Sequence, residues 1–135
     1  MMKRRLIQVF LMWVACSGCS DPDRSLPPAY RDLTVPLDEL QSQPARQSGQ
    51  ALFVEHCALC HGERGDGRGE RREGFERPPR DFTSSAWRRE TTPRHIYYTI
   101  SEGVRGTAMP AWKTLDPAQT WDLVAYVLSL SAEGS

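Results

Sequence analysis

Two cysteines and a histidine stand close together in the run Cys57-Ala-Leu-Cys60-His61. The C-x-x-C-H spacing is typical of c-type haem attachment, in which two thiols bond to the porphyrin vinyl groups and the adjacent histidine binds the iron. A structural zinc site needs four ligands, and the chain after its first 20 residues adds only His56 and His95. A thioredoxin-like redox pair would need a β-α-β pattern around the cysteines, and none is visible. We therefore predict one haem c, bound through Cys57 and Cys60.

Three segments have the pattern of helices that could surround this site. The first runs from about Pro44 to Cys57 and places Gly49 and Phe53 on one face. Glycine inside a helix costs up to about 1 kcal/mol relative to alanine. We therefore expect Gly49 to allow the close approach of another helix.

The second predicted helix begins at Thr92-Pro93, which are typical of an N-cap and a first helical position, and ends at Gly103. Ile96 and Ile100 lie one turn apart in it, so we expect both to face the core or the porphyrin. His95 in the first turn is an alternative iron ligand. We expect it instead to be solvated or to act in capping.

The third predicted helix has the clearest start. Asp116, Pro117 and Gln119 form the pattern of a capping box with proline in the first turn. The helix has a continuous apolar face, so we expect it to be buried against the Gly49 and Phe53 face. The residues of this apolar face are Leu123, Tyr126, Val127 and Leu130.

The segments between these helices have the composition of loops. Residues 62–70 contain four glycines without a helical period, and they lack the Gly-Lys-Ser/Thr end of a P-loop. Nine arginines between Arg64 and Arg94 alternate with acidic residues, which indicates a solvated surface. Met109 lies in the run Gly106-Thr-Ala-Met-Pro-Ala-Trp112. Methionine is commonly core filler, but no amphipathic face surrounds this one.

The N-terminal residues have the features of an export signal. Lys3-Arg4-Arg5 precedes an apolar stretch over residues 6–15, about half the length that a membrane-spanning helix needs. Gly18-Cys19-Ser20 resembles the bacterial lipobox, in which the cysteine is acylated and becomes the mature N-terminus. Cys16 is an alternative acylation position, and an ordinary signal peptide with incidental cysteines is the competing interpretation. We predict a lipoprotein-type signal peptide over residues 1–18 and lipidation at Cys19.

Residues 19–43 contain four of the ten prolines, which predicts a semi-extended, proline-rich tether. On a free linker the large apolar side chains of Tyr30 and Leu33 would be exposed to water, so we expect part of this tether to lie against the folded domain. That domain is predicted to cover residues 44–135.

The order of these features resembles that of a class I monohaem bacterial cytochrome c, in a lipoprotein-type, membrane-anchored variant. The resemblance covers about residues 44–130. It implies an all-α, small cytochrome c fold, with three or more helices and loops wrapped around one covalently bound haem. It also implies that His61 and Met109 are the axial ligands, and that the carbonyl of Pro78 or Pro79 accepts a hydrogen bond from His61.

The resemblance implies a one-electron carrier, not an enzyme, that shuttles electrons between redox partners at a membrane surface. Its partners would be other redox proteins or membrane respiratory complexes, met through a transient interface. Without the three basic residues of the signal peptide, 14 Lys and Arg stand against 17 Asp and Glu, which argues against nucleic-acid binding. The expected location is the periplasmic side of a bacterial membrane, lipid-anchored after export. Two alternatives remain open: a haem subunit of a respiratory complex, and a gas- or peroxide-binding haem protein with a labile Met109.

Overall fold

The structure is a computed structural model and describes residues 21–131. The predicted signal peptide over residues 1–18 and the predicted lipidation site Cys19 lie outside this part of the chain, as do residues 132–135. Within residues 21–131 all regular secondary structure is helical. The predicted all-α class is therefore confirmed.

Two of the described helices are long and the rest are short. None of them is both long enough and apolar enough to cross a bilayer. In chain order they are η1 (Pro22–Ser25), α1 (Pro28–Arg31), α2 (Leu37–Gln41), α3 (Gln43–His56), α4 (Ala58–His61), η2 (Glu70–Arg72), α5 (Ser85–Glu90), α6 (Pro93–Glu102) and α7 (Pro117–Leu130).

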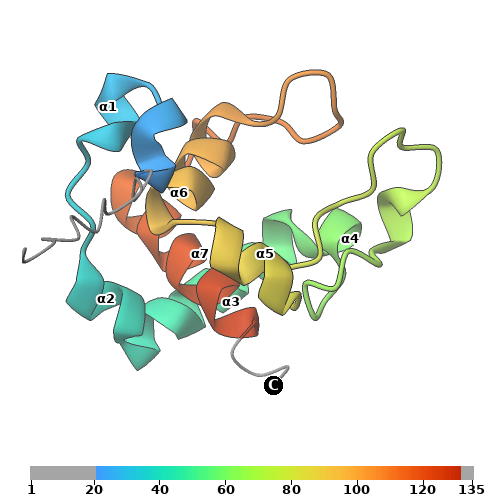
Figure 1. The fold of residues 1–135 in the computed structure, drawn as a ribbon. Helices are drawn as coiled ribbons and strands as arrows, with labels where there is room; N and C mark the ends of the chain where they lie inside the picture. The colour runs from blue at the N-terminus through green and yellow to red at the C-terminus, as the bar shows by residue number, and fades with distance from the viewer. Residues whose placement is uncertain (1–20, 132–135) are drawn as a thin grey trace, which may run out of the picture.

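The two longest helices, α3 and α7, pack across each other (Figure 1). Their approach is close at Gly49, where an added Cβ atom would lie 2.6 Å from the carbonyl carbon of Asp122 and 2.9 Å from Cβ of Tyr126. One turn later Phe53 is fully buried, with its ring centroid 5.2 Å from that of Tyr126. The predicted close approach at Gly49 is confirmed.

Helix α7 begins with the predicted capping box. The Asp116 carboxylate accepts a hydrogen bond from the Gln119 backbone N–H, and the Gln119 side chain accepts one from the Asp116 backbone N–H. The rest of the helix forms the centre of the hydrophobic core, because nearly every apolar side chain in it is buried. The buried apolar residues of α7 are Trp121, Leu123, Val124, Ala125, Tyr126, Val127 and Leu130.

Helix α6 also matches its prediction. The Thr92 side chain caps it by accepting from the His95 backbone N–H, and Ile96 and Ile100 are buried in the same core as α7. Helix α5 was not predicted. Its only sequence signal is Ser84, whose hydroxyl accepts from the Trp87 backbone N–H as an N-cap.

Residues 21–43 differ from the predicted semi-extended tether. They form η1, α1 and α2, and the last two contact α6 and α7 respectively (Figure 1). Leu26 and Leu40 are buried, Leu33 packs against the core, and the Tyr30 ring lies 4.9 Å from that of Tyr98. The expectation for Tyr30 and Leu33 is confirmed. Because the leucines on either side are buried as well, the packed unit already begins at residue 21 instead of at residue 44.

Candidate haem-binding site

Of the two cysteines in the C-x-x-C-H run, Cys57 directly precedes α4 and Cys60 lies in its single turn. Cys57 is at once the C-cap of α3 and the N-cap of α4, with φ of −119°, so the chain bends there between the two helices. The backbone N–H groups of Cys60 and His61 both donate to the Cys57 carbonyl. This turn places both thiols and the imidazole on one short element.

The cysteines are half-buried, and neither is in a disulfide. Burial raises the pKa of the Cys57 thiol to about 12, and the charge of Cys60 adds to the rise. Redox-active thiol pairs show the opposite behaviour, with one thiol pKa lowered. The environment of Cys57 therefore argues against a thioredoxin-like function.

The His61 ring is oriented by a backbone carbonyl. Nδ1 of His61 lies 3.1 Å from the carbonyl oxygen of Arg80, which can only accept, so the proton is on Nδ1. Burial lowers the pKa of His61, and the Arg80 carbonyl offsets this only in part. The ring is therefore neutral with its lone pair on Nε2, which is the form that binds a metal.

The predicted carbonyl was that of Pro78 or Pro79, and the structure corrects this by one or two residues to Arg80. A Cβ atom added to Gly67 would lie 2.7 Å from the Pro79 carbonyl oxygen, so that carbonyl faces the loop after α4. The next carbonyl, on Arg80, is the one that lies within hydrogen-bond distance of His61.

Phe82 was not predicted as a site residue, although it stands three positions after Pro79. Its ring stacks on the His61 ring with centroids 4.6 Å apart and planes 20° apart. It also contacts the rings of Phe53 and Trp87, and its backbone N–H donates to the Gly65 carbonyl. Phe82 thus connects the histidine to the core. The sequence has no signal for this contact, because His61 and Phe82 are 21 residues apart.

The loop after His61 folds back over α4. Its glycine N–H groups satisfy carbonyls at the end of that helix: Gly62 donates to Ala58, Gly67 to His61 and Gly69 to Cys60. Carbonyls in the last turn of a helix have no partner inside the helix. The glycine-rich loop therefore stabilises the turn that carries the cysteines.

Met109 lies in a loop with its own internal hydrogen bonds. The Thr107 hydroxyl accepts from the Met109 backbone N–H at 3.2 Å and donates to the Val104 carbonyl at 2.8 Å. Gly103, with φ of +68°, packs directly against this loop, since an added Cβ would lie 2.7 Å from the backbone nitrogen of Ala111. Only glycine suits both the conformation and the space at this point.

Two observations bring the Met109 loop toward the C-x-x-C-H turn. The Trp112 ring lies 4.9 Å from the ring of His56, which directly precedes Cys57. A pocket of about 240 Å³ is lined on one side by residues 74–77 and on the other by residues 106–108. The loop that follows α4 and the loop that carries Met109 therefore face each other.

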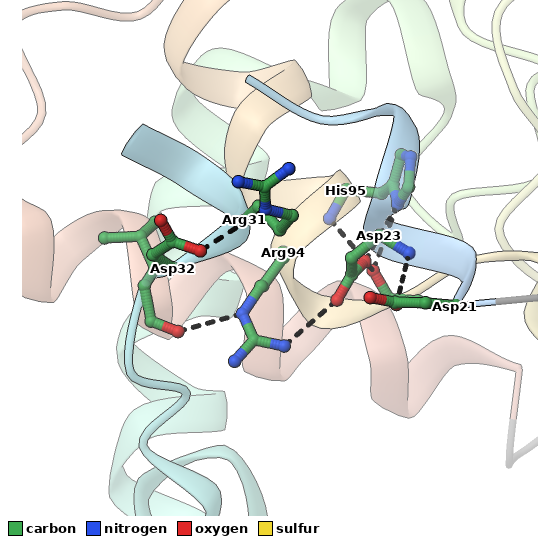
Figure 2. A network of polar contacts seen from close by, with 8 residues as sticks. Asp21, Asp23, Arg31, Asp32, Arg94 and His95 are labelled. Atoms are coloured by element: carbon green, nitrogen blue, oxygen red, sulfur yellow. Dashed lines mark hydrogen bonds and ion pairs between the residues drawn. The ribbon is translucent and has the colours of Figure 1, made fainter. Parts of the chain in front are cut away.

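His95 is engaged elsewhere. Its Nδ1 lies 3.2 Å from the Asp23 carboxylate (Figure 2) and 3.1 Å from the Thr92 hydroxyl, and its Nε2 lies 3.4 Å from the Ser25 hydroxyl. By contrast, Nε2 of His61 has no hydrogen-bond partner among the described residues. The part of the chain that the structure describes also has no cluster of three or more His, Cys, Asp or Glu side chains that could hold a metal ion.

A family model described as "Cytochrome C oxidase, cbb3-type, subunit III" matches residues 44–127, well over half of the chain. The chain belongs to this family. Cytochrome c domains of this kind carry covalently bound haem c and transfer electrons, so the predicted cytochrome c class is confirmed.

Relatives of this cytochrome c are subunits of the same type of oxidase. The chain is 35% identical over 88 residues to "Cbb3-type cytochrome c oxidase subunit FixP" of Azorhizobium caulinodans. The matched region covers 64% of this chain and 28% of that protein. It is 31% identical over 121 residues to "Cbb3-type cytochrome c oxidase subunit CcoP" of Rhodobacter capsulatus. Here the matched region covers 80% of this chain and 38% of that protein. The cytochrome thus spans between about a quarter and two fifths of the length of these relatives.

The fold of the cytochrome is also found in a solved structure. The "Kuenenia stuttgartiensis reducing HAO-like protein complex Kustc0457/Kustc0458" matches with a TM-score of 0.59 and 28% sequence identity, over 66% of this chain and 44% of that chain. Together with the helical architecture, this match confirms the small cytochrome c fold.

The residues of this turn and of the Met109 loop fit a c-type haem. Cys57 and Cys60 offer two unpaired thiols on one turn, and His61 offers a neutral ring with Nε2 available. Met109 offers a soft thioether from a loop that faces this region. The predicted haem-lining residues Ile96 and Ile100 lie in the hydrophobic core, and Pro79 lies beside Gly67 in the loop that covers α4.

Proposed function

We propose that this cytochrome is a single-haem electron-transfer subunit of a membrane respiratory complex of the cbb3 oxidase type. The family match over residues 44–127 carries this proposal, and the relatives' names supply the partner. The names favour a fixed subunit over a free shuttle. The chain spans less than two fifths of the length of those relatives, so the complex itself is part of the proposal.

In this proposal Cys57 and Cys60 would attach the haem, and His61 and Met109 would bind its iron. The haem, when bound, supplies one-electron chemistry at its iron. Arg80 fixes the tautomer of His61 through its carbonyl, and Phe82 fixes the plane of the ring. Thr107 and Gly103 limit the motion of the Met109 loop. If His61 and Met109 both bound the iron, no position would be left for a substrate, and the haem would transfer electrons without catalysis.

We further propose that the chain is exported and acylated at Cys19, so that it is anchored on the periplasmic side of a bacterial membrane. The support is the sequence: a basic start, a short apolar stretch and Gly18-Cys19-Ser20. Several acyl chains on one cysteine hold a protein firmly at a bilayer, whereas a single chain binds reversibly.

The test combines a redox titration of the purified protein, followed by optical spectra, with native electrophoresis of detergent-solubilised membranes. We expect one covalently bound haem with a single one-electron transition, and we expect the haem-stained chain to migrate with an active respiratory oxidase. Migration as a free small protein would reject the subunit assignment and favour the shuttle. Rapid binding of carbon monoxide by the ferrous wild type would reject the filled sixth position.

A further inference from the structure

The N-terminal segment, defined here as residues 21–35, is attached to α6 by a network around a buried carboxylate. Asp23 is 6% exposed, and its carboxylate accepts hydrogen bonds from the Thr92 hydroxyl and from Arg94, whose Nη1 lies 3.0 Å away. Nδ1 of His95 lies 3.2 Å from Oδ1 of Asp23, the oxygen that Thr92 also contacts, whereas Arg94 contacts Oδ2. Figure 2 shows the side chains of Arg94 and His95 converging on Asp23.

Arg94 fixes the N-terminal segment at a second point. Its Nε donates to the Leu33 carbonyl at 2.8 Å, so one guanidinium joins residues 23 and 33 of the segment to the start of α6. A buried charge that loses its partner destabilises the state that buries it. Asp23 therefore stabilises the docked segment only while Arg94 and its neighbours remain in contact with it.

Apolar contacts strengthen the same docking. Leu26 is buried, and the Tyr30 ring lies against the rings of Tyr97 and Tyr98 on α6. The Tyr30 hydroxyl donates to Glu102 at the far end of α6. The segment thus follows α6 from its first turn to its last.

The docked segment begins only two residues after Cys19. Two residues of extended chain span at most about 7 Å. If residues 20–42 were a flexible linker, the root-mean-square distance between its ends would be roughly 25 Å. The position of Asp23 therefore decides how far an acylated Cys19 would lie from the folded domain.

We propose that the domain is fixed directly at the membrane surface, with η1 and the N-terminal end of α6 facing the lipid headgroups. This inference rests on the proposed acylation of Cys19. The N-terminal segment has three acidic side chains, Asp21, Asp23 and Asp32, against Arg24 and Arg31, so it offers no positive excess for anionic lipids. The contact is set by the acyl group and the short chain, and it does not require anionic lipid.

The test uses full-length, acylated holoprotein in phosphatidylcholine vesicles that carry a fluorescent headgroup label. The haem quenches the label by energy transfer, which falls steeply with distance. We expect strong quenching by the wild type and a loss of quenching in Asp23→Lys, which repels Arg94 and His95. Asp32→Lys is the matched control, because Asp32 is exposed and pairs only with its neighbour Arg31. It should quench like the wild type.

A second variant leaves the Asp23 network intact. A flexible Gly-Ser insertion of about 20 residues between Ser20 and Asp21 should reduce quenching as Asp23→Lys does. It lengthens the chain between Cys19 and the docked segment and leaves the contacts of Asp23 unchanged. Equal quenching by the wild type and the insertion variant would overturn the proposal. Stronger quenching with anionic vesicles, abolished by salt, would also overturn it, because the contact would then be electrostatic.

Trypsin digestion of Cys19→Ser holoprotein separates this inference from the proposed anchor. We expect Arg24 and Arg31 to resist cleavage in this background and to be cut rapidly once Asp23→Lys is added. Rapid cleavage without Asp23→Lys would overturn the docked segment, whatever happens at Cys19. Mass spectrometry that shows an unmodified mature N-terminus would instead reject the anchor, and the membrane-facing surface with it, while the docking result would stand.

Discussion

His61 and His95 are both half-buried histidines whose Nδ1 contacts an oxygen atom, yet their surroundings differ in one respect. His61 uses Nδ1 for a backbone carbonyl and has an aromatic ring against one face. His95 uses Nδ1 for a carboxylate and a hydroxyl, and its Nε2 lies near another hydroxyl. The first arrangement leaves a nitrogen for iron. The second uses the whole ring to join two segments of the chain.

This difference separates two kinds of polar contact in a small protein. A single acceptor on one nitrogen orients a histidine without consuming it. A network in which every polar atom has a partner stabilises a docking instead. If the two regions are divided in this way, changes around His61 should affect the haem, and changes around His95 should affect only the docked segment.

The largest effect should come from removing the thioether bonds. We expect the double variant Cys57→Ala, Cys60→Ala to contain no haem that resists acid and denaturant, and to yield little folded protein, since a domain this small depends on its cofactor for part of its core. Haem staining of denaturing gels measures this. Cys19→Ala should retain covalent haem. Covalent haem in the double variant would refute attachment at this turn.

The next effect compares the two regions directly. Met109→Ala should lower the reduction potential, because a thioether ligand favours ferrous iron, and should open the iron to cyanide and carbon monoxide. His95→Ala should change neither property, since its ring is engaged by Asp23 and Thr92. Optical titrations with each ligand provide the measurement. If His95→Ala opened the iron and Met109→Ala did not, the iron would be bis-histidine.

A smaller effect is expected at Phe82. Truncation in Phe82→Ala removes ring contacts to His61, Phe53 and Trp87, and we expect the free energy of unfolding to fall by about 2 kcal/mol, less than for a fully buried phenylalanine. The haem should remain attached. Denaturant unfolding checks the stability, with Leu37→Ala on the exposed surface as the comparison. If Phe82→Ala and Leu37→Ala had equal free energies of unfolding, the ring contacts of Phe82 would not stabilise the fold around His61.

The smallest effect concerns acid. Burial raises the pKa of Asp23, but its contacts with Thr92, Arg94 and His95 outweigh this, so the pKa is lowered from 3.8. A carboxyl with a lower pKa in the folded state stabilises it above the unfolded pKa, and this contribution is lost as the pH falls through the folded value. We therefore expect residues 21–35 to stay docked at pH 5 and to be released below about pH 4.

Hydrogen exchange of residues 21–35 as a function of pH measures this release. In Asp23→Asn the protection factor, which is the intrinsic exchange rate at each pH divided by the measured rate, should no longer depend on pH in this range, whereas Asp32→Asn should behave like the wild type. A release that begins near pH 6 would point to a histidine instead of to Asp23.

The sequence by itself determined the features that depend on neighbouring residues. The C-x-x-C-H spacing predicts haem c within five residues, and the caps at Thr92 and Asp116 predict where α6 and α7 begin. The glycine in α3 predicted a helix crossing, because its cost in a helix demands a reason. Each of these signals lies within one or two helical turns, so no knowledge of the distant chain is needed to interpret it.

Only the tertiary structure decided which distant groups meet. It selected the Arg80 carbonyl over that of Pro79, because contacts between segments 19 residues apart decide which carbonyl reaches His61. It also packed the proline-rich segment onto α6, through an ion pair between Asp23 and Arg94, 71 residues apart. Proline content describes the local stiffness of a chain, but a buried carboxylate is stable only where the fold supplies its partners, and those partners belong to another part of the sequence.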